Sequence, residues 1–409
     1  MMFLNHTKNG DVTPDIFFII CDPEGKPSSR MTGVQSAKIN FDMENPTTLE
    51  LEAVSDKSFY YLSQCDGSEL IRVDYKDFTW YFAPRTFELK VNKLTTPIAK
   101  FSAVDAMGAF RSQIAYNGVD ATHVRQNFKT TFQQKGASPN SYLGNNGFVG
   151  FTPFGTSNKA ASFETRAMQW GELMDIYTEQ AGLRFVIETY RNSSGQLQNT
   201  LVYFEPGKYV AEIDESLRGY VPRWRFDRGD FSDYEVKTTA AEAQVLMMYD
   251  DAEDVNDSRT VNKVDKDKSM FAIREAIMHT PKEMFANIAR DPASSPEVGF
   301  FAKNAYARAD VKVALAEHVV NRMTNSPRGD ERKIKAFRSG QCWRPGMLVD
   351  IVIGDVTQRQ EIVRAELVLE NGRFQVTPVL ATPGAGSRDF YSKLGDLNST
   401  VQRMSQRRS

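Results

Sequence analysis

The stretch Thr48–Val54, Thr-Leu-Glu-Leu-Glu-Ala-Val, decides the fold class of this chain. Its apolar residues alternate with Glu50 and Glu52, a period of two that gives a β-strand one apolar face and one face in water. Residues 85–92 repeat the alternation, and residues 78–82 add an aromatic run typical of strands. Several such strands within about the first hundred residues predict a small barrel or sandwich.

The overall composition is that of an ordinary folded protein. The chain has 409 residues, enough for two to four domains. Lys plus Arg is 50 and Asp plus Glu is 52, a net charge of −2, which excludes a histone-like or polybasic protein. Hydrophobic residues make up 41% and charged residues 25%, which excludes a wholly disordered chain.

No membrane or secretory feature is expected. The longest purely apolar run, Ile16–Cys21, spans six residues, against roughly 20 for a membrane helix. Residues 1–11 lack the pattern of a secretory signal. The three cysteines, Cys21, Cys65 and Cys342, are too few and too far apart for a disulfide framework or a zinc site, which favours a reducing compartment.

The period changes from two to helical after the first strands. Val124, Phe128 and Phe132 recur every four residues and predict a helix from Asp120 to Gly136. A second helix is expected over 164–181, ended by a glycine at the next position. Its apolar stripe comprises Ala167, Trp170, Met174, Tyr177 and Ala181.

The rest of the chain is predicted to return to strands. Residues 183–204 read as a hairpin, 250–268 as a charged loop and 309–323 as a helix. Four further strands are expected at 333–338, 347–353, 360–370 and 373–380. Asn371-Gly372 is a strong signal for a hairpin turn between the last two. No repeat of fixed period is visible in the sequence.

Enzyme motifs are absent, and we therefore predict no enzymatic activity, no cofactor and no metal. The phosphate-binding loop, the zinc motif H-E-x-x-H, the nucleophile elbow G-x-S-x-G and the dinucleotide motif G-x-G-x-x-G are all missing. The four histidines lie far apart in the sequence. The acidic run 250–257 lacks the glycine that a calcium loop needs at its turn, so a solvated loop is the better interpretation.

Arginine and aromatic residues interleave between Arg218 and Arg228, which is one pattern for binding nucleic acid. Aspartates sit alongside, and the same alternation describes an ordinary strand with arginines on its wet face. Without a wider basic field, the strand is the favoured interpretation.

A long loop rich in Gly, Ser and Asn is expected at 133–163. Phe148, Phe151 and Phe154 are spaced three apart within it. Structureless loops of this length inside compact domains are usually functional or disordered. Because a disordered linker rarely keeps apolar anchors, we predict that these three phenylalanines contact another subunit, with packing on their own domain as the alternative.

The order of elements resembles the tail hub proteins of long-tailed bacteriophages, also called baseplate hub or tail-associated proteins. The resemblance rests on the strand at 48–52, the strand at 101–105 followed by a short helix, the segment 269–275 and the barrel opening at 344–350. Such families often have Tyr-Gly-Arg-Arg-Glu-like residues where this chain has Phe-Ala-Ile-Arg-Glu at 271–275.

The resemblance implies a β-rich α+β fold with two small antiparallel β-barrels, an intervening helix-plus-hairpin region and linking helices. The expected division is 1–110 for the N-terminal barrel, 111–235 for the α/β region, 236–325 for linking strands, the charged loop and a helix, 326–385 for the C-terminal barrel, and 386–409 for a tail.

In function, the resemblance implies a structural virion protein. Three copies would form a ring that joins the tail tube or distal tail protein to the tail-tip or fibre proteins. Genome DNA would pass through its lumen without sequence-specific binding. The protein would be assembled in the host cytoplasm and end in the virion tail.

Two other functions stay open at this point. A receptor- or glycan-binding tail protein would use Trp80, Tyr81 or Trp343 as exposed sugar platforms. A cell-wall hydrolase would need two carboxylates about 5 to 10 Å apart in a cleft.

Overall fold

The computed structural model describes most of the chain outside its two ends and several internal segments. The described residues are 16–43, 45–75, 78–92, 95–116, 123–136, 152–165, 168–191, 197–213, 215–239, 245–250, 258–262, 275–280, 308–323, 331–340, 342–370 and 373–381. Strands dominate them and helices are short, so the predicted β-rich α+β class is confirmed. No helix among them is long and apolar enough to span a membrane.

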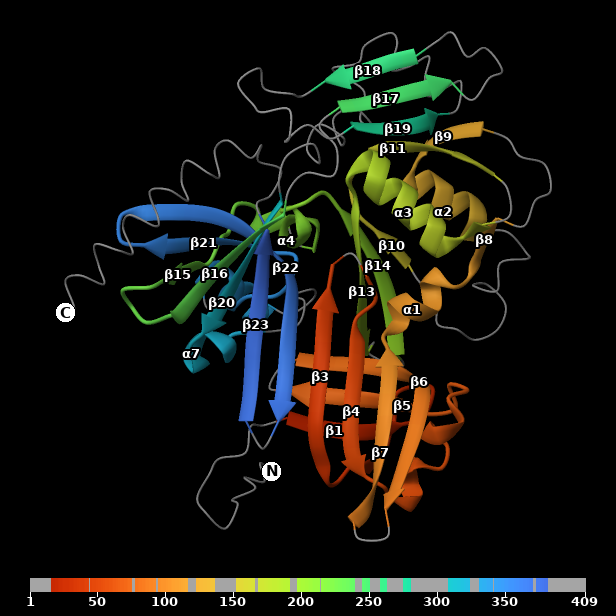
Figure 1. The fold of residues 1–409 in the computed structure, drawn as a ribbon, viewed down its shortest axis with the longest axis vertical. Coiled ribbons are helices and arrows are strands. Elements are labelled where there is room, and N and C mark those ends of the chain that lie inside the picture. Colours follow the sequence, from red (N-terminus) through yellow and green to blue (C-terminus); the bar gives the residue numbers. More distant parts are fainter. Residues whose placement is uncertain are drawn as a thin grey trace.

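A 13-stranded sheet forms the body of the molecule (Figure 1). Its order is β16-β20-β23-β22-β3-β4-β7-β6-β5-β1-β2, with β21 paired to β22 and β15 to β21. Its strands are β1 (Ile16–Cys21), β2 (Pro27–Arg30), β3 (Val34–Asp42), β4 (Thr48–Val54), β5 (Leu70–Tyr75), β6 (Phe78–Asn92), β7 (Thr95–Val104), β15 (Arg223–Arg225), β16 (Phe231–Thr239), β20 (Arg308–Leu315), β21 (Leu348–Ile353), β22 (Val356–Glu370) and β23 (Arg373–Ala381).

Two groups of five strands within this sheet have the same plan. We call β3, β4, β5, β6 and β7 the N-terminal unit, and β16, β20, β21, β22 and β23 the C-terminal unit. In each unit the strands follow one another in the same order and with the same antiparallel pairing. β5 begins at Leu70 and β6 at Phe78, while β21 begins at Leu348 and β22 at Val356. The third and fourth strands are therefore equally far apart along the sequence in the two units.

The irregularities of the two units match as well. β6 and β22 are both 15 residues long, and each has a bulge after its seventh residue, between Pro84 and Thr86 and between Ile362 and Arg364. β3 and β16 are both 9 residues long, and each has a bulge directly after its first residue. Because a bulge bends a strand, β6 and β22 each take part in two layers.

The alternation that predicts the first strands is confirmed. In β4, Leu49, Leu51 and Ala53 are buried while Glu50 is exposed. The first half of β6 pairs with β5 and its second half with β7. The apolar faces of both layers join one hydrophobic core that continues into the C-terminal unit. Burial of these alternating side chains is what holds the layers together.

The strand order of the described residues is open, from β16 at one end to β2 at the other, and no closed barrel is found among them. The two units are hydrogen-bonded to each other through β3 and β22. The two-barrel arrangement and the predicted domain boundaries stay predictions. The pairing does place β20, from the region expected to link the barrels, between β16 and β23.

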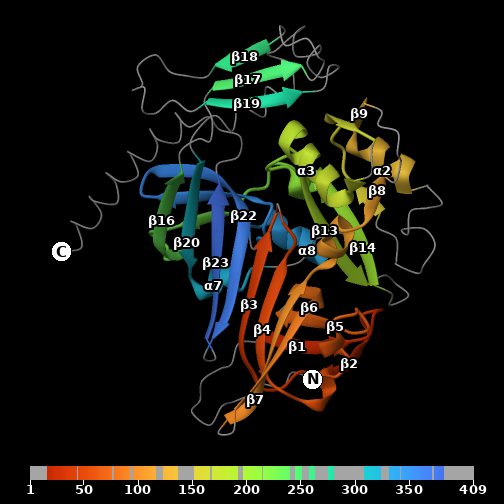
Figure 2. The same cartoon turned by 45° about the vertical axis from the view of Figure 1, so that its right-hand side comes forward.

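A second hydrophobic core lies in the middle of the chain, where helices cover a small sheet (Figures 1 and 2). The predicted hairpin is confirmed as two antiparallel strands. We call this part of the chain the middle region; its elements are α1 (Ala106–Arg111), β8 (Ile114–Tyr116), β9 (His123–Asn127), α2 (Phe128–Gly136), β10 (Thr152–Phe154), β11 (Ala160–Glu164), β12 (Met168–Gln169), α3 (Trp170–Ala181), β13 (Arg184–Arg191), β14 (Leu197–Phe204), α4 (Tyr209–Ile213) and η3 (Glu215–Leu217).

The two helices predicted here are shorter than expected. The first begins at Phe128 because His123–Asn127 pairs with Ala160–Glu164 as a strand, and the second begins at Trp170 because Met168–Gln169 pairs with β8. Their buried stripes are confirmed from these starts onward. The predicted glycine end is confirmed too, since Gly182 has a φ of +65° and caps α3.

Two predictions near the C-terminus are wrong. The helix expected over 309–323 is a strand over Arg308–Leu315, followed by the short helix α7 (Glu317–Val320). Val311 and Val313 are both buried, because β20 lies between β16 and β23. The strand expected at 333–338 is the helix α8 (Glu331–Arg338), with Phe337 buried.

A separate three-stranded sheet lies at one end of the molecule (Figure 2). It consists of β17 (Val245–Asp250), β18 (Ser258–Asn262) and β19 (Glu275–Thr280). The charged loop expected at 250–268 is wrong at Ser258–Asn262, which pairs with β17 as a strand. The rest of that loop after residue 250, the segment 269–274 and the tail 386–409 lie outside the described residues.

Candidate functional site

A buried ion pair joins the middle region to the C-terminal unit. Two nitrogens of Arg344 lie 3.0 and 3.3 Å from the two carboxylate oxygens of Glu188, in β13. The hydroxyl of Tyr209, in α4, donates a hydrogen bond to the same carboxylate. All three side chains are buried, with Arg344 only 4% exposed. We call Glu188, Tyr209 and Arg344 the junction.

The position of Arg344 follows from the sequence Arg344-Pro345-Gly346. Gly346 has a φ of +90°, and its N–H donates to the carbonyl oxygen of Ile362 at 2.7 Å, so the chain turns sharply into β21. A Cβ at Gly346 would lie 3.0 Å from Cγ of Tyr209. The turn therefore packs directly against the junction and needs glycine.

Arg344 also contacts the aromatic rings around it. Its guanidinium carbon lies 4.9 Å from the ring centre of Tyr209 and 5.9 Å from that of Phe78 at the start of β6. One side chain thus contacts the N-terminal unit, the middle region and its own turn. Burial lowers the pKa of the Arg344 guanidinium, whereas Glu188 opposes this shift and stabilises the charge.

A second ion pair joins the same hairpin to the C-terminal unit. Arg184, also in β13, lies 3.4 Å from the carboxylate of Glu361 in β22, which is fully buried. The N–H of Gly207 donates to the same carboxylate at 3.0 Å. Because both buried carboxylates have cationic partners, these groups hold the hairpin against the C-terminal unit.

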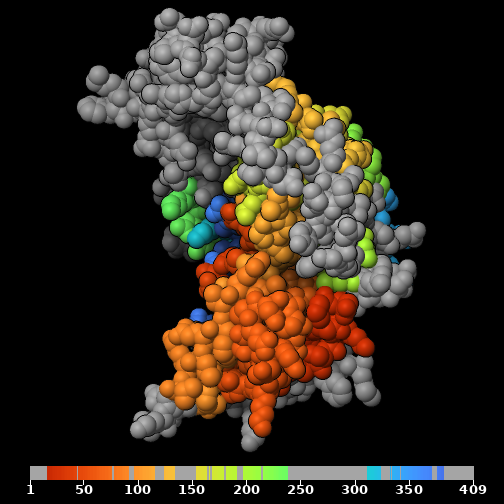
Figure 3. Space-filling model, turned by 90° about the vertical axis from the view of Figure 1, so that its right-hand side faces the viewer, coloured from red at the N-terminus to blue at the C-terminus, as the bar shows by residue number. Residues whose placement is uncertain are grey.

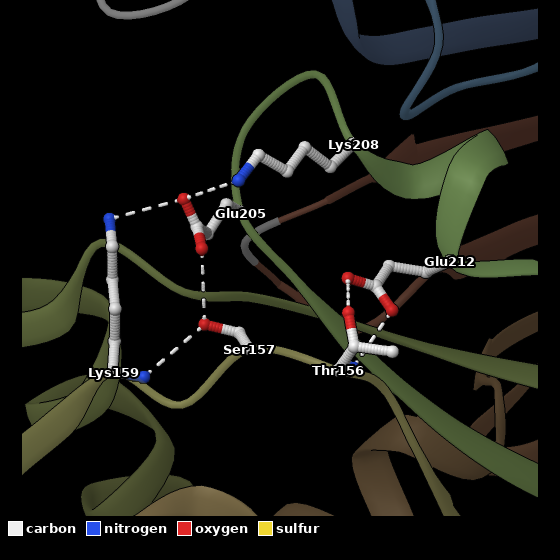
Figure 4. Close-up of polar contacts among 6 residues, drawn as sticks. All are labelled: Thr156, Ser157, Lys159, Glu205, Lys208 and Glu212. Carbon is white, nitrogen blue, oxygen red and sulfur yellow. Dashed lines mark hydrogen bonds and ion pairs between the residues drawn. The ribbon is translucent and has the colours of Figure 1, made fainter. Parts of the chain in front are cut away.

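The end of the predicted long loop is hydrogen-bonded to the middle region (Figure 4). The N–H and hydroxyl of Thr156 donate to the two oxygens of Glu212, in α4, at 2.8 and 2.7 Å. The hydroxyl of Tyr203 donates to the carbonyl oxygen of Gly155 at 2.6 Å. The chain is therefore held directly after β10.

Glu205 is the centre of the second set of contacts in Figure 4. Its carboxylate lies 3.0 Å from the ammonium of Lys208 and 3.4 Å from that of Lys159, and it accepts from the hydroxyl of Ser157 at 3.3 Å. Burial disfavours its charged form, but the two lysines outweigh burial and lower the pKa of Glu205. Because two cations hold the Glu205 carboxylate in its charged form, this residue suits positioning rather than proton transfer.

The predicted interface residues are only partly placed. Phe148 and Phe151 lie outside the described residues. Phe154 lies in β10, which pairs in parallel with β14, and its half-buried ring packs against the main core. Their predicted role between subunits stays a prediction.

The aromatic residues considered as sugar platforms are in the core. Trp80, Tyr81 and Trp343 are all buried, and the indole N–H of Trp343 donates to the carbonyl oxygen of Val319 at 2.7 Å. A buried ring cannot stack on a sugar, so these residues give no support to glycan binding. The expectation of exposed sugar platforms at these three residues is therefore wrong.

Within the arginine-rich segment 218–228, only Arg223–Arg225 forms a strand, β15, and turns lie on both sides of it. Trp224 in β15 is buried, and Arg225 is paired with Asp227 at 2.8 Å. His318 lies 2.9 Å from Asp230. No group of three or more His, Cys, Asp or Glu side chains able to hold a metal is found in the described part of the chain.

The junction was not predicted from the sequence. The only signal is that Glu188 directly follows the apolar residues 185–187 and Glu361 directly precedes Ile362 and Val363, where a buried, unpaired charge would be costly. Their partners, Arg344 and Arg184, lie in distant parts of the chain. Only the fold brings them together.

No protein-family model matches the sequence, and no curated protein matches it either. Solved structures do resemble the fold. A tail protein from Neisseria meningitidis MC58 has a TM-score of 0.56 at 12% sequence identity, covering 91% of this chain and 99% of that chain.

Two further solved structures give the same result. The 43 kDa tail protein of prophage MuSo2 from Shewanella oneidensis has a TM-score of 0.53 at 11% identity, covering 90% of this chain and 99% of that chain. A prophage tail protein from Listeria monocytogenes EGD-e has a TM-score of 0.51 at 10% identity, covering 94% and 99%. The chain therefore has, over almost its whole length, a fold found in phage tail proteins.

Proposed function

We propose that the protein is a structural component of a phage tail, a hub that forms a homotrimeric ring between the tail tube and the tail tip. The observation that carries this proposal is the pair of matching five-stranded units in one chain. Three chains then supply six similar units to a sixfold tube, while keeping threefold symmetry towards the tip. The fold likeness to phage tail proteins supports the same class.

The junction fits such a role. A hub must keep its two units at a set angle, so that six of them form one ring. Arg344 and Glu188 hold the C-terminal unit to the middle region, and Arg344 also contacts Phe78 of the N-terminal unit. A buried ion pair of this kind favours one arrangement over others, because any shift would leave a charge unpaired.

The partners of this hub would be further copies of itself, the tail tube or distal tail protein, and tail-tip or fibre proteins. DNA would pass through the ring without sequence-specific contacts, consistent with the net charge of −2. Its place would be the virion tail, after assembly in the host cytoplasm.

Two measurements test the proposal. Light scattering of the purified protein should give the mass of three 46.2 kDa chains, and class averages should show threefold particles with a central opening. The second measurement should use particles formed with co-expressed tail-tip components, which stabilise a weak ring by mass action. A chain that is monomeric in both experiments would contradict the ring.

A further inference from the structure

Each of the two units has, at one side, a sheet edge without a strand partner among the described residues. In the N-terminal unit it is the outer edge of β6 after its bulge, since β5 pairs only with the first half of that strand. In the C-terminal unit it is the edge of β16 that does not face β20. Figure 1 shows the two edges at opposite sides of the sheet. Bare edges of this kind are pairing sites.

The partner of each edge can be derived from the contact between the two units. Within one chain, β22 of the C-terminal unit pairs with β3 of the N-terminal unit. β22 is the counterpart of β6, and β3 is the counterpart of β16. The same contact, repeated between two copies, joins β6 of one copy to β16 of the next.

The exposed side chains on β6 show that its edge is incomplete. Leu89 is 47% exposed and Val91 is 69% exposed, although both are large and apolar. Counted from the first residue of each strand, their counterparts in β22 are Leu367 and Leu369, which are 1% and 9% exposed beside β3. Figure 3 shows the side of the molecule on which the orange N-terminal unit lies at the surface.

We propose that the outer edge of β6 binds β16 of a second copy, antiparallel and in the register of the β3–β22 contact. Counted from the first residues of β3 and β16, the counterpart of Ile39 is Val236. The pair Leu367 and Ile39 therefore becomes Leu89 and Val236 of the second copy. This inference rests on the proposed ring and names the surface that closes it.

Charge complementarity supports this register. It places Glu88 opposite Lys237 and Lys90 opposite Glu235, so both charged pairs are of opposite sign. All four side chains are exposed in the single chain. Within the chain, the corresponding face of the β3–β22 contact also has ion pairs, such as Lys38 with Glu366 at 2.6 Å. Opposite charges directly across an antiparallel pair stabilise it.

The apolar faces fit in the same register. It places Val91 opposite Tyr234 and Leu89 opposite Val236. Tyr234 and Val236 are half-buried against the main core, on the same face of the sheet as the buried residues of β3. Pairing would therefore extend the core across the contact between copies. Because every copy has one edge of each kind, head-to-tail pairing ends when a ring closes.

A charge exchange tests the pairing directly. Lys90→Glu brings a second carboxylate opposite Glu235, and we expect each contact to weaken about fivefold. In a ring of three such contacts, the assembly constant should fall about a hundredfold. The double variant Lys90→Glu/Glu235→Lys should restore assembly, as measured by sedimentation equilibrium. Lys57→Glu, the same charge change at an exposed residue of the short 3-10 helix η1 (Lys57–Phe59), is the matched control and should assemble normally.

A covalent test uses Leu89→Cys together with Val236→Cys, with Cys65 and Cys342 replaced by serine. Mild oxidation should link separate chains, and Leu89→Cys alone should not. If the protein assembles but the charge variants have no effect and no link forms, the edge pairing is wrong while the trimer stands. If links form in particles of another size, the pairing stands and the trimer is wrong.

Discussion

The N-terminal and C-terminal units have one backbone plan and two different surroundings. The strands, their order and their bulges agree between them. The C-terminal unit, however, has its β22 edge covered by β3 and is held by two ion pairs with buried carboxylates, whereas the β6 edge of the N-terminal unit has no strand partner among the described residues. The same plan can therefore supply an internal contact in one place and a docking edge in another, depending on which side chains it presents.

The largest expected difference in stability between the units concerns the residue just before the third strand of each, β5 or β21. Arg344→Ala should lower the free energy of unfolding by about 3–5 kcal/mol, because it leaves the Glu188 carboxylate buried without its cation. The residue at the matching position before β5 is Asp66, which is exposed and accepts a hydrogen bond from the N–H of Ser68.

Asp66→Ala should therefore cost no more than about 1 kcal/mol. Urea denaturation of both variants measures the difference. Equal losses of stability would mean that the junction does not hold the C-terminal unit in place.

The matching leucines give the next largest effect. Leu367→Ala opens a cavity beside β3, and we expect it to lower the free energy of unfolding by about 2–5 kcal/mol. Leu89→Ala removes a half-exposed side chain and should change monomer stability by less than about 0.5 kcal/mol. Chemical denaturation of dilute monomer is the measurement. A large loss for Leu89→Ala in the monomer would show that this edge is covered within one chain.

The glycines before the third strands should differ less in the stability that alanine costs. Gly67 and Gly346 have φ values of +83° and +90°, so alanine is strained at both positions, at about 1 kcal/mol. A Cβ at Gly346 would also lie 2.9 Å from Cε of Met43, whereas nothing lies within 4 Å at Gly67. Gly346→Ala should therefore be the more destabilising, by about 1–2 kcal/mol. Thermal melts of the two variants compare them, and equal melting temperatures would contradict the close packing of this turn.

The pH-dependent effect concerns Asp105, at the end of the N-terminal unit. Asp105 caps α1 through the N–H of Met107, and desolvation raises the pKa of its carboxyl to about 6. The folded protein therefore holds this proton more tightly than the unfolded chain, whose Asp pKa is about 3.9. The stabilisation is complete below about pH 4 and is lost as the pH rises through about 6, by up to about 3 kcal/mol.

Asp105→Asn keeps a capping side chain without a titrating proton, so its stability should lack this decline. The measurement is the difference in unfolding free energy between variant and wild type from about pH 4 to 7. A constant difference across that range would show that Asp105 titrates normally.

Strands with strict alternation could be predicted from the sequence, since a period of two with charged outward positions allows few other structures. Elements with short, mixed patterns could not be predicted from the sequence. Residues 309–323 place Val311, Leu315 and Val319 at helical spacing, yet Val311 and Val313 also alternate with Asp310 and Lys312. The neighbours decided the outcome, because β16 and β23, both distant in sequence, supply hydrogen-bonding edges on either side of β20.

The sequence by itself determined the β-rich class, the hairpin of the middle region and the glycine end of its long helix, because these depend on contacts between near neighbours in the chain. The repeat of the two units and the junction were decided only by the tertiary structure. Backbone pairing needs no particular side chains, so two units of one plan can differ at most positions and show no visible repeat. Arg344 and Glu188 become partners only when strands far apart in sequence fold against each other, since only then does burial make their pairing necessary.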